Sequence, residues 1–470
     1  MKMNRRDFIF SAGAATALAG CRSLTGFGAP ELRFGVVSDI HVTTPKSCRL
    51  LEKALRHFKS RGVDAVMIPG DLTDWGIRAS LVYVKETWDR VFAGTGVTPL
   101  FCTGNHDYDG WNYGDMTMEM HANGYSESDR LNRGKDGLAR AWAEIFGERF
   151  APARVRSVKG YEFVCGEYGA DQAAVDWFRE HGERLRASGR PFFYFQHLPL
   201  RGTTVDSHGW ADTGALTPVL AQFPNCVAFT GHTHRPFTDE RSIWQDGFTV
   251  VNVPSLSYAC LPGGGHENAS GASAKPPVMA MQPLRRDLRG GQGYVVDVYG
   301  DRLVIERRDL EEDAEGGPAW TVPFGRLGAY APYSYAAREA TEPVPAFPAG
   351  AAVEVDTRNC RNRAGGWAIS LNCEFPSAKM PRGSRVFDYE LKVVSASEPL
   401  VRRFFSPAYA YLPSREPARQ RFWFDVRELP QDVDWHLEVR ARNCFGRCSA
   451  PLVSSVWHGK PGLAEADEKL

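Results

Sequence analysis

Five short polar motifs, each directly after a short apolar run, constrain the fold of this chain more than any other feature. The motifs are Asp39-Ile40-His41, Gly70-Asp71-Leu72-Thr73-Asp74, Gly104-Asn105-His106-Asp107, Gln196-His197 and Gly231-His232-Thr233-His234. The apolar runs have strand character and cover residues 32–37, 65–69, 99–103, 192–195 and 227–230. Helix-compatible patterns lie between them, at residues 46–61, 79–92, 171–187 and 212–223. This alternation predicts an α/β domain with polar side chains at the carboxyl ends of neighbouring strands, where open α/β sheets bind ligands.

The motifs supply candidate metal ligands of two chemical types. The seven side chains are Asp39, His41, Asp71, Asn105, His197, His232 and His234. Carboxylates and amides are hard oxygen donors, whereas imidazole suits Zn, Fe, Mn or Ni. The mixture fits two first-row cations that share Asp71: one held also by Asp39, His41 and His234, the other by Asn105, His197 and His232. Two cations roughly 3.5 to 4 Å apart clamp an in-line displacement and turn the water between them into a bridging hydroxide, so a phosphoryl group is the expected electrophile.

In the order and spacing of all five motifs, the chain resembles the calcineurin-like metallophosphoesterase superfamily over about residues 32–310. The resemblance implies a four-layer α/β/β/α sandwich and two divalent or mixed-valence ions of Mn, Fe or Zn. It also implies that His106 donates a proton to the leaving oxygen and that Asp74 orients His106. Taken alone, Asp74 has another reading as a turn or helix N-cap residue before Trp75, and His106 another as a packing residue.

Two departures from sister families narrow the expected activity. Purple acid phosphatases have a tyrosine at the position of Asp74, and protein Ser/Thr phosphatases have an arginine at the position of Trp75. The motif strings are most similar to those of the group that contains the class III cyclic-nucleotide phosphodiesterases. We therefore expect a phosphate-ester hydrolase that favours phosphodiesters. A phosphomonoesterase, nucleotidase-like activity included, is the alternative, and a non-catalytic surface adhesin is a distant one.

The amino terminus predicts export. Asn4-Arg5-Arg6-Asp7-Phe8-Ile9 is a twin-arginine pattern, and the apolar stretch 8–19 that follows is shorter than the roughly 20 residues of a membrane-spanning helix. Leu18-Ala19-Gly20-Cys21 resembles a bacterial lipobox. We expect residues 1–21 to be a twin-arginine signal, Cys21 to be lipidated and anchored in a membrane facing the periplasm or cell surface, and residues 22–31 to be a tether. The alternative is an ordinary signal cleaved elsewhere, with Cys21 incidental.

Charge and cysteine content restrict the partners and the crosslinks. The 470-residue chain has 56 Lys and Arg against 56 Asp and Glu, so no global field attracts polyanions and no nucleic acid polymer is expected as a partner. Three cysteines in apolar runs are expected to be core thiols: Cys102, Cys165 and Cys226. Cys360 with Cys373, or Cys444 with Cys448, could form disulfides in an oxidising compartment.

Residues 32–325 are the predicted catalytic domain, with two insertions. Residues 108–158 follow the Asn105-His106 motif and are a candidate cap over the metal ions. Residues 257–291 are rich in Gly, Ala and Pro, which favours a mobile rim loop or a disordered insertion without a binding role. Three histidines near the motifs are expected at the surface: His121, His208 and His266.

The last third of the chain predicts a second domain. Residues 326–350 are rich in Pro and Ala, which is typical of a linker. Short alternating strands follow at residues 352–355, 367–373, 387–394, 420–426 and 435–441, and residues 437–446 resemble the final hairpin of a fibronectin type III domain. This pattern predicts an all-β immunoglobulin/fibronectin III-like sandwich at 351–460, then a tail at 461–470. A spacer or docking role is expected; direct substrate binding is the alternative.

Overall fold

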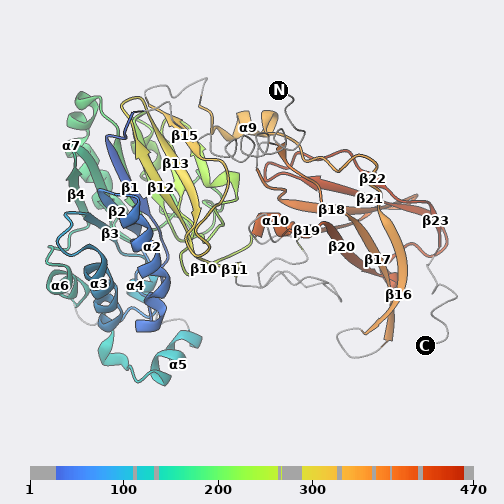
Figure 1. Ribbon diagram of the computed structural model, residues 1–470, viewed down its shortest axis with the longest axis horizontal. Coiled ribbons are helices and arrows are strands. Elements are labelled where there is room, and N and C mark those ends of the chain that lie inside the picture. The colour runs from blue at the N-terminus through green and yellow to red at the C-terminus, as the bar shows by residue number, and fades with distance from the viewer. Residues whose placement is uncertain are drawn as a thin grey trace, which may run out of the picture.

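The computed structural model describes residues 28–109, 114–131, 137–262, 266, 288–324, 331–361, 367–381, 384–410 and 416–459. The predicted export signal, Cys21 and the predicted tail lie outside these residues. Figure 1 shows an α/β domain beside a C-terminal all-β domain, with α9 (Tyr335–Thr341) and α10 (Pro407–Ala410) at their junction. The predicted fold class, an α/β domain followed by a β-sandwich, is confirmed.

Two sheets lie face to face in the α/β domain. The first has the order β14-β13-β12-β1-β2-β3, with β15 beside β13, and the second has the order β4-β5-β6-β7-β9-β8. The first sheet contains β1 Leu32–Val36, β2 Ala65–Pro69, β3 Thr98–Cys102, β12 Gln292–Val298, β13 Arg302–Asp309, β14 Ala314–Glu315 and β15 Trp320–Pro323. The second contains β4 Ala153–Val158, β5 Tyr161–Gly166, β6 Phe192–Gln196, β7 Cys226–Thr230, β8 Ile243–Gln245 and β9 Thr249–Asn252. Each of the five runs that precede a motif forms a strand.

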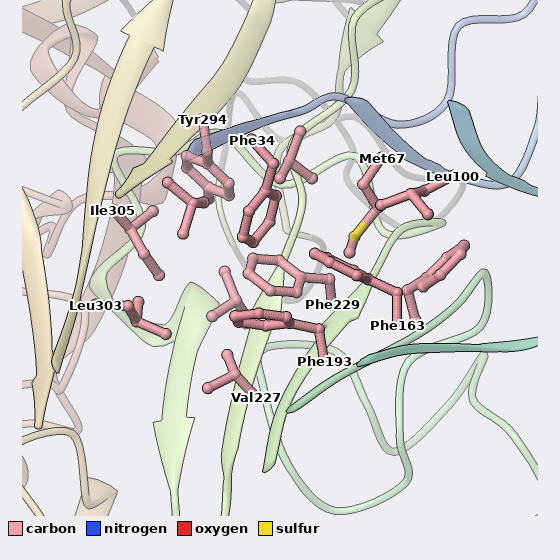
Figure 2. Close-up of a cluster of buried hydrophobic side chains, with 14 of the residues drawn as sticks. Phe34, Met67, Leu100, Phe163, Phe193, Val227, Phe229, Tyr294, Leu303 and Ile305 are labelled. Carbon is pink, nitrogen blue, oxygen red and sulfur yellow. The ribbon is translucent and has the colours of Figure 1, made fainter. Parts of the chain in front are cut away.

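Aromatic side chains fill the space between the two sheets. Phe34 of β1 meets Phe163, Phe193 and Phe229 of the second sheet edge-on, with ring centroids 5.3, 5.0 and 5.8 Å away (Figure 2). Edge-to-face packing at these separations is favourable beyond the area that it buries. The central strands are apolar on both faces because helices cover their outer sides.

Helices form the two outer layers. On the first sheet lie α2 Cys48–Ser60, α3 Arg78–Phe92 and α6 Gly137–Phe146, whose apolar faces share one core with the outer side of β2. On the second lie α7 Asp171–Ser188 and α8 Thr217–Leu220. The spacing of Leu51, Leu55 and Phe58 in α2 shows why these segments are helical, since one apolar face recurs with each turn.

The helix predicted over residues 212–223 is wrong in its extent. Only α8, four residues long, forms there. Gly214 has a φ of 87°, which no right-handed helix contains, and Pro218 is placed at the helix start, where its missing N–H costs nothing. The carboxylate of Asp212 accepts hydrogen bonds from the backbone of Arg201 and Gly214 and so holds a loop instead.

The first predicted insertion is only partly a separate segment. It begins at the end of α4 (Asn105–Asp109) and contains α5 Gly114–Ala122 and α6, but β4 belongs to the second sheet. Met120 and Tyr125 pack against Trp75 and Ile77, directly after Asp74. The insertion therefore lies against the second motif, and its role as a cap stays a prediction. Of the second insertion, β10 (Tyr258–Ala259) pairs with β11 (Leu288–Arg289), and much of the rest lies outside the described residues.

The C-terminal domain is a β-sandwich of two antiparallel sheets. One has the order β16-β17-β20, and the other β19-β18-β21-β22 with β23 beside β21. The strands are β16 Glu354–Arg361, β17 Trp367–Pro376, β18 Asp388–Ser395, β19 Leu400–Phe405, β20 Arg419–Asp425, β21 Asp434–Arg442, β22 Leu452–Val453 and β23 Trp457–His458. Tyr389, Leu371 and Trp435 are buried between the sheets. The likeness to fibronectin type III stays a prediction.

Neither predicted disulfide is formed among the described residues, because Cys373, Cys444 and Cys448 all carry free thiols. Cys373 is paired across the sheet with Val355, five positions along β16 from Cys360. Cys444 packs into the cluster between the domains, whereas the thiol of Cys448 donates to the carbonyl of Gly446. The prediction that Cys102, Cys165 and Cys226 are core thiols is confirmed by their burial.

A buried polar network joins the two domains. The carboxylate of Glu240 accepts hydrogen bonds from Arg307 (2.7 Å), from Arg338 of α9 (2.9 Å) and from the indole of Trp320 (2.9 Å). The neighbouring Asp239 accepts a hydrogen bond of 2.8 Å from the hydroxyl of Tyr409, in the C-terminal domain. The stretch predicted as a linker therefore contains a helix that is bonded to the α/β domain.

His266 and Arg241 add further contacts between the domains. Nε2 of His266 lies 2.6 Å from a carboxylate oxygen of Asp388, and its ring stacks on Phe405 with centroids 3.8 Å apart. His266 is buried, so its predicted place at the surface is wrong, whereas His121 and His208 are exposed. The guanidinium of Arg241 lies 4.7 Å from the ring centroid of Phe387. The two domains therefore form a joint with its own core.

Glu240→Gln tests this joint. Removal of the charge leaves the buried guanidinium groups of Arg307 and Arg338 without their shared partner, which costs about 3–5 kcal/mol for a buried pair. We expect a clear fall in the temperature of thermal unfolding, followed by circular dichroism. The same substitution at Glu339, exposed on α9, is the control and should change nothing. Equal unfolding temperatures for the two variants would show that the network does not stabilise the joint.

Candidate metal centre

Glycines let the five motifs approach one another at the carboxyl ends of β1, β2, β3, β6 and β7. A Cβ on Gly70 would lie within 3.0 Å of the His197 ring, and one on Gly104 within 3.0 Å of Asp71. A Cβ on Gly231 would meet Ser38 and Asp39 equally closely. Only a hydrogen atom fits at these three positions. The glycine that precedes each of three motifs is therefore required for the close packing of the loops.

The backbone is strained where the candidate ligands lie. Among the described residues, eight that are not glycine have a positive φ. Five of the eight are candidate ligands: Asp39 (51°), His41 (45°), Asp71 (50°), His232 (73°) and His234 (53°). Such left-handed residues cost of order 1–3 kcal/mol each and cluster at functional sites. These strained residues lie at the carboxyl ends of β1, β2 and β7, where their side chains converge.

Asp39, His41, Asp71 and His234 form the first group, with one ligand atom of each within 4.8 Å of the others. Nε2 of His41 and Nε2 of His234 are 3.2 Å apart. Nδ1 of His41 lies 2.7 Å from the Asp74 carboxylate, and Nδ1 of His234 lies 2.9 Å from the carbonyl oxygen of Tyr258. With a proton on each Nδ1, the two Nε2 atoms both present lone pairs to the same point. A cation between them fits this arrangement.

Asp71, His197 and His232 form the second group. Nδ1 of His197 lies 3.0 Å from the carbonyl oxygen of Pro69, so Nε2 of a neutral His197 is an acceptor. The amide oxygen of Asn105, another acceptor, lies 2.9 Å from that Nε2. In this neutral form both atoms are acceptors and can bind one cation, so Asn105 completes the second group.

Asp71 belongs to both groups. Its Oδ2 lies 3.2 Å from Nε2 of His197 and 3.7 Å from Nε2 of His41. This oxygen is buried and accepts no hydrogen bond from any residue that the structure describes. A buried carboxylate oxygen without a hydrogen bond is costly unless a metal ion binds it. The donor set therefore fits two ions that share Asp71, and the structure brings all seven candidate ligands together.

Asp74 touches two histidines with one carboxylate oxygen. Oδ1 lies 2.7 Å from Nδ1 of His41 and 3.1 Å from Nδ1 of His106. Burial would raise the pKa of Asp74, but the hydrogen bonds with His106 and His41 outweigh it and hold that pKa well below its usual range. The sequence predicted the contact with His106. It did not predict that Asp74 also orients a candidate metal ligand, as second-shell carboxylates commonly do.

His106 has the protonation state that a general acid needs. Burial would lower the pKa of His106, but the hydrogen bond to Asp74 and the charges of Asp71 and Asp74 raise it to about 9. The ring is therefore protonated at neutral pH in the metal-free protein. It lies edge-on to His41, with centroids 4.5 Å apart. His106 thus lies next to the first group.

Asp107 is a residue to which the sequence analysis gave no role. Its buried carboxylate accepts hydrogen bonds from the backbone of Gly104 (2.8 Å), Thr73 (2.8 Å) and Leu72 (3.2 Å). It therefore ties the second motif to the third. Burial and the charge of Asp71 raise the pKa of Asp107 to about 7. The one sequence signal for this role of Asp107 was its position directly after His106. A carboxylate that accepts hydrogen bonds from backbone amides produces no periodic sequence pattern.

Comparison with known proteins identifies the α/β domain. Residues 32–236 match the family of calcineurin-like phosphoesterases, so the chain carries a calcineurin-like metallophosphoesterase domain. This match and the candidate dimetal ligand cluster support a hydrolase that acts on phosphoric ester bonds. No curated protein sequence matches the chain.

Solved structures with a similar arrangement include three from different organisms. A dimetal phosphatase from Danio rerio has 13% identity and a TM-score of 0.36, over 63% of this chain and 100% of its own. The yellow lupin purple acid phosphatase PPD1 has 14% identity and a TM-score of 0.36, over 62% of this chain and 53% of its own. An archaeal phosphodiesterase has 12% identity and a TM-score of 0.25, over 62% of this chain and 100% of its own.

Asp71→Asn tests whether one residue serves both ions. An amide oxygen keeps a donor but loses the charge that both groups share, so the purified variant should bind fewer than two metal ions and lose activity. Mass spectrometry of bound metals after gel filtration measures this. Asp176→Asn, on the exposed side of α7, is the matched control and should keep the metal content of the parent. A full metal complement in Asp71→Asn would contradict the bridging role.

Proposed function

We propose that this chain is an exported phosphodiesterase with a dinuclear metal site. The observation that carries the proposal is the position of Asp71, whose buried oxygen faces His41 of one ligand group and His197 of the other. When bound, two cations would acidify a water and neutralise charge on the phosphoryl oxygens. The chain's own ligands would hold them: Asp39, His41, Asp71 and His234 on one side, and Asp71, Asn105, His197 and His232 on the other.

The residues around the metal site have separate roles in proton transfer, ligand orientation and loop positioning. His106, next to His41 of the first ligand group, is placed to give a proton to the oxygen of the departing group. Asp74 stabilises the charged ring of His106 and fixes the orientation of His41. Asp107 holds the loops of the second and third motifs at a constant separation. The aromatic ring of Tyr258, 4.3 Å from His234, forms a wall of the first ligand group.

The charges near the fifth motif favour a diester over a monoester. A monoester carries up to two negative charges, and a bidentate arginine is a common partner for them. Arg235 directly follows His234, but its guanidinium is paired with Asp206 and donates to the carbonyl of Cys260. A diester carries one negative charge and has less need of such a partner. Bis(4-nitrophenyl) phosphate should therefore have a higher kcat/KM than 4-nitrophenyl phosphate; the reverse order would favour the monoesterase alternative.

His106→Ala tests the general acid. An alkoxide leaves poorly without a proton, so kcat for an alkyl diester should fall on the order of 10²- to 10⁴-fold, while a 4-nitrophenyl ester should lose much less. Metal content should stay at the parent level. Asp74→Asn should show the same bias more weakly and should also lower metal content, because Asp74 holds His41. His121→Ala, an exposed histidine of α5, is the control. Equal losses on both esters would exclude His106 as the acid.

Export and membrane attachment are the second part of the proposal. They are supported by the twin-arginine pattern and by Leu18-Ala19-Gly20-Cys21. Within the described part of the chain, no helix is both long and apolar enough to cross a bilayer. We propose that acyl chains on Cys21 hold the protein at a membrane that faces the periplasm or cell surface, with two or more chains needed for stable anchoring.

Cys21→Ala tests the anchor. The variant should move from the membrane fraction to the soluble fraction of the host, because the acyl chains that bind the bilayer are lost. Fractionation followed by immunoblotting measures the distribution. Cys448→Ala, which removes a thiol in a turn of the C-terminal domain, should leave the protein in the membrane fraction. A Cys21→Ala protein that still sediments with membranes would rule out the lipoprotein assignment.

A further inference from the structure

Trp210 is an exposed aromatic side chain beside the metal centre. It is 77% exposed, the largest fraction among the exposed large apolar side chains of the described residues. Its ring centroid lies 6.2 Å from that of His232, with the ring planes tilted by 44°. Tryptophan is highly buried on average, because an indole in water forgoes a large hydrophobic gain. An indole exposed next to a candidate metal ligand is therefore unusual.

Hydrogen bonds within its own loop hold Trp210 in this position. The backbone N–H of Arg201 donates to the Asp212 carboxylate (2.9 Å), and the Arg201 guanidinium donates to the carbonyls of Asp212 (3.0 Å) and His208 (3.2 Å). These bonds close the loop around residues 208–212. The position of the Trp210 backbone is thus set by the loop and does not depend on burial of the ring.

The same loop is bonded to the segment that follows the fifth motif. The guanidinium of Arg235 forms an ion pair with Asp206. The backbone N–H of Val205 donates to the carbonyl of Arg241 (3.1 Å). Because Arg235 directly follows His234, the loop and the candidate ligands form one framework. The loop that carries Trp210 is therefore anchored next to His232, which favours a preorganised contact for a ligand.

Trp210 and His106 are next to different ligand groups. His106 is grouped with His41 and Asp74, beside the first ligand group, whereas Trp210 lies against His232 of the second group. The departing group of a phosphate ester must be near the residue that protonates it. A diester has a second organic group that remains on phosphorus, and a departing group beside His106 leaves the side of the second ligand group for it.

We propose that Trp210 binds the organic group that remains on phosphorus and that it selects diesters in which this group is a flat unsaturated ring. The proposal rests on the proposed phosphodiesterase function and adds the substrate class. A planar indole face stacks on aryl or base rings but gains little from a short alkyl chain. A monoester has no remaining organic group, so Trp210 has nothing to bind in that case.

Two diesters with the same leaving group isolate the contribution of Trp210. Bis(4-nitrophenyl) phosphate and ethyl 4-nitrophenyl phosphate both release 4-nitrophenolate, and they differ only in the group that remains. Trp210→Ala should raise KM for the first about 5- to 100-fold, the usual effect of one lost stacking partner. Its kcat for that substrate should change less than about threefold. KM for the ethyl ester should stay at the parent value, and Trp210→Phe should restore most of the loss.

Measured metal content separates stacking from a structural role. If Trp210 only supports His232, the Trp210→Ala variant will bind less metal and will lose the same share of its activity on both esters. That result overturns the proposal. An unchanged KM of Trp210→Ala for bis(4-nitrophenyl) phosphate also overturns the proposal. In that case, activity of the parent protein on both esters still supports the phosphodiesterase function. If the metal-loaded parent hydrolyses neither diester, the proposed function fails and the role of Trp210 fails with it.

Discussion

The carboxylate of Asp71 is the contact on which the rest of the catalytic edge depends. Its Oδ1 accepts a hydrogen bond from the backbone of His106 (2.9 Å), and its backbone carbonyl accepts from the N–H groups of Ile40 and His41. Its Oδ2 faces His41 and His197. One residue therefore connects the first four motifs. Its left-handed backbone makes this possible, and Gly104 leaves the room for it.

The sequence predicted the elements whose pattern is local. The five runs before the motifs form strands because each is buried on both faces, and the seven candidate ligands meet because parallel strands end at one edge. The helix prediction over residues 212–223 was wrong in its extent because Gly214 has a positive φ. Strand β19 was missed because paired arginines and paired phenylalanines interrupt its alternation. The roles of Asp107 and Asp74 depend on partners in other motifs, which no local pattern encodes.

The sequence also did not predict how the C-terminal domain packs against the α/β domain. Asp239-Glu240-Arg241 has the composition of a solvated turn, yet its partners Arg338 and Tyr409 lie about 100 and 170 positions away and bury it. This segment begins five residues after His234. A second contact is made by Leu261, three residues after Tyr258, which packs with Tyr409. The C-terminal domain therefore contacts two segments that closely follow residues of the metal centre along the chain. A spacer on a flexible linker would not need such contacts.

The same geometry links metal binding to folding. Asp39, Asp71 and Asp74 are three acidic side chains close together, and the first two are buried almost completely. In the metal-free protein His106 and His197, whose pKa values are raised to about 9, place positive charge beside these carboxylates. The charge on His197 is lost when it binds metal through a neutral ring. Five left-handed residues add backbone strain. Two divalent ions would offset both costs at once, because they bind only where the five motifs are assembled. Assembly of the five motifs is therefore a requirement of the metal site. Close packing at Gly70, Gly104 and Gly231 and the hydrogen bonds to the carboxylates of Asp71 and Asp107 keep the motifs together.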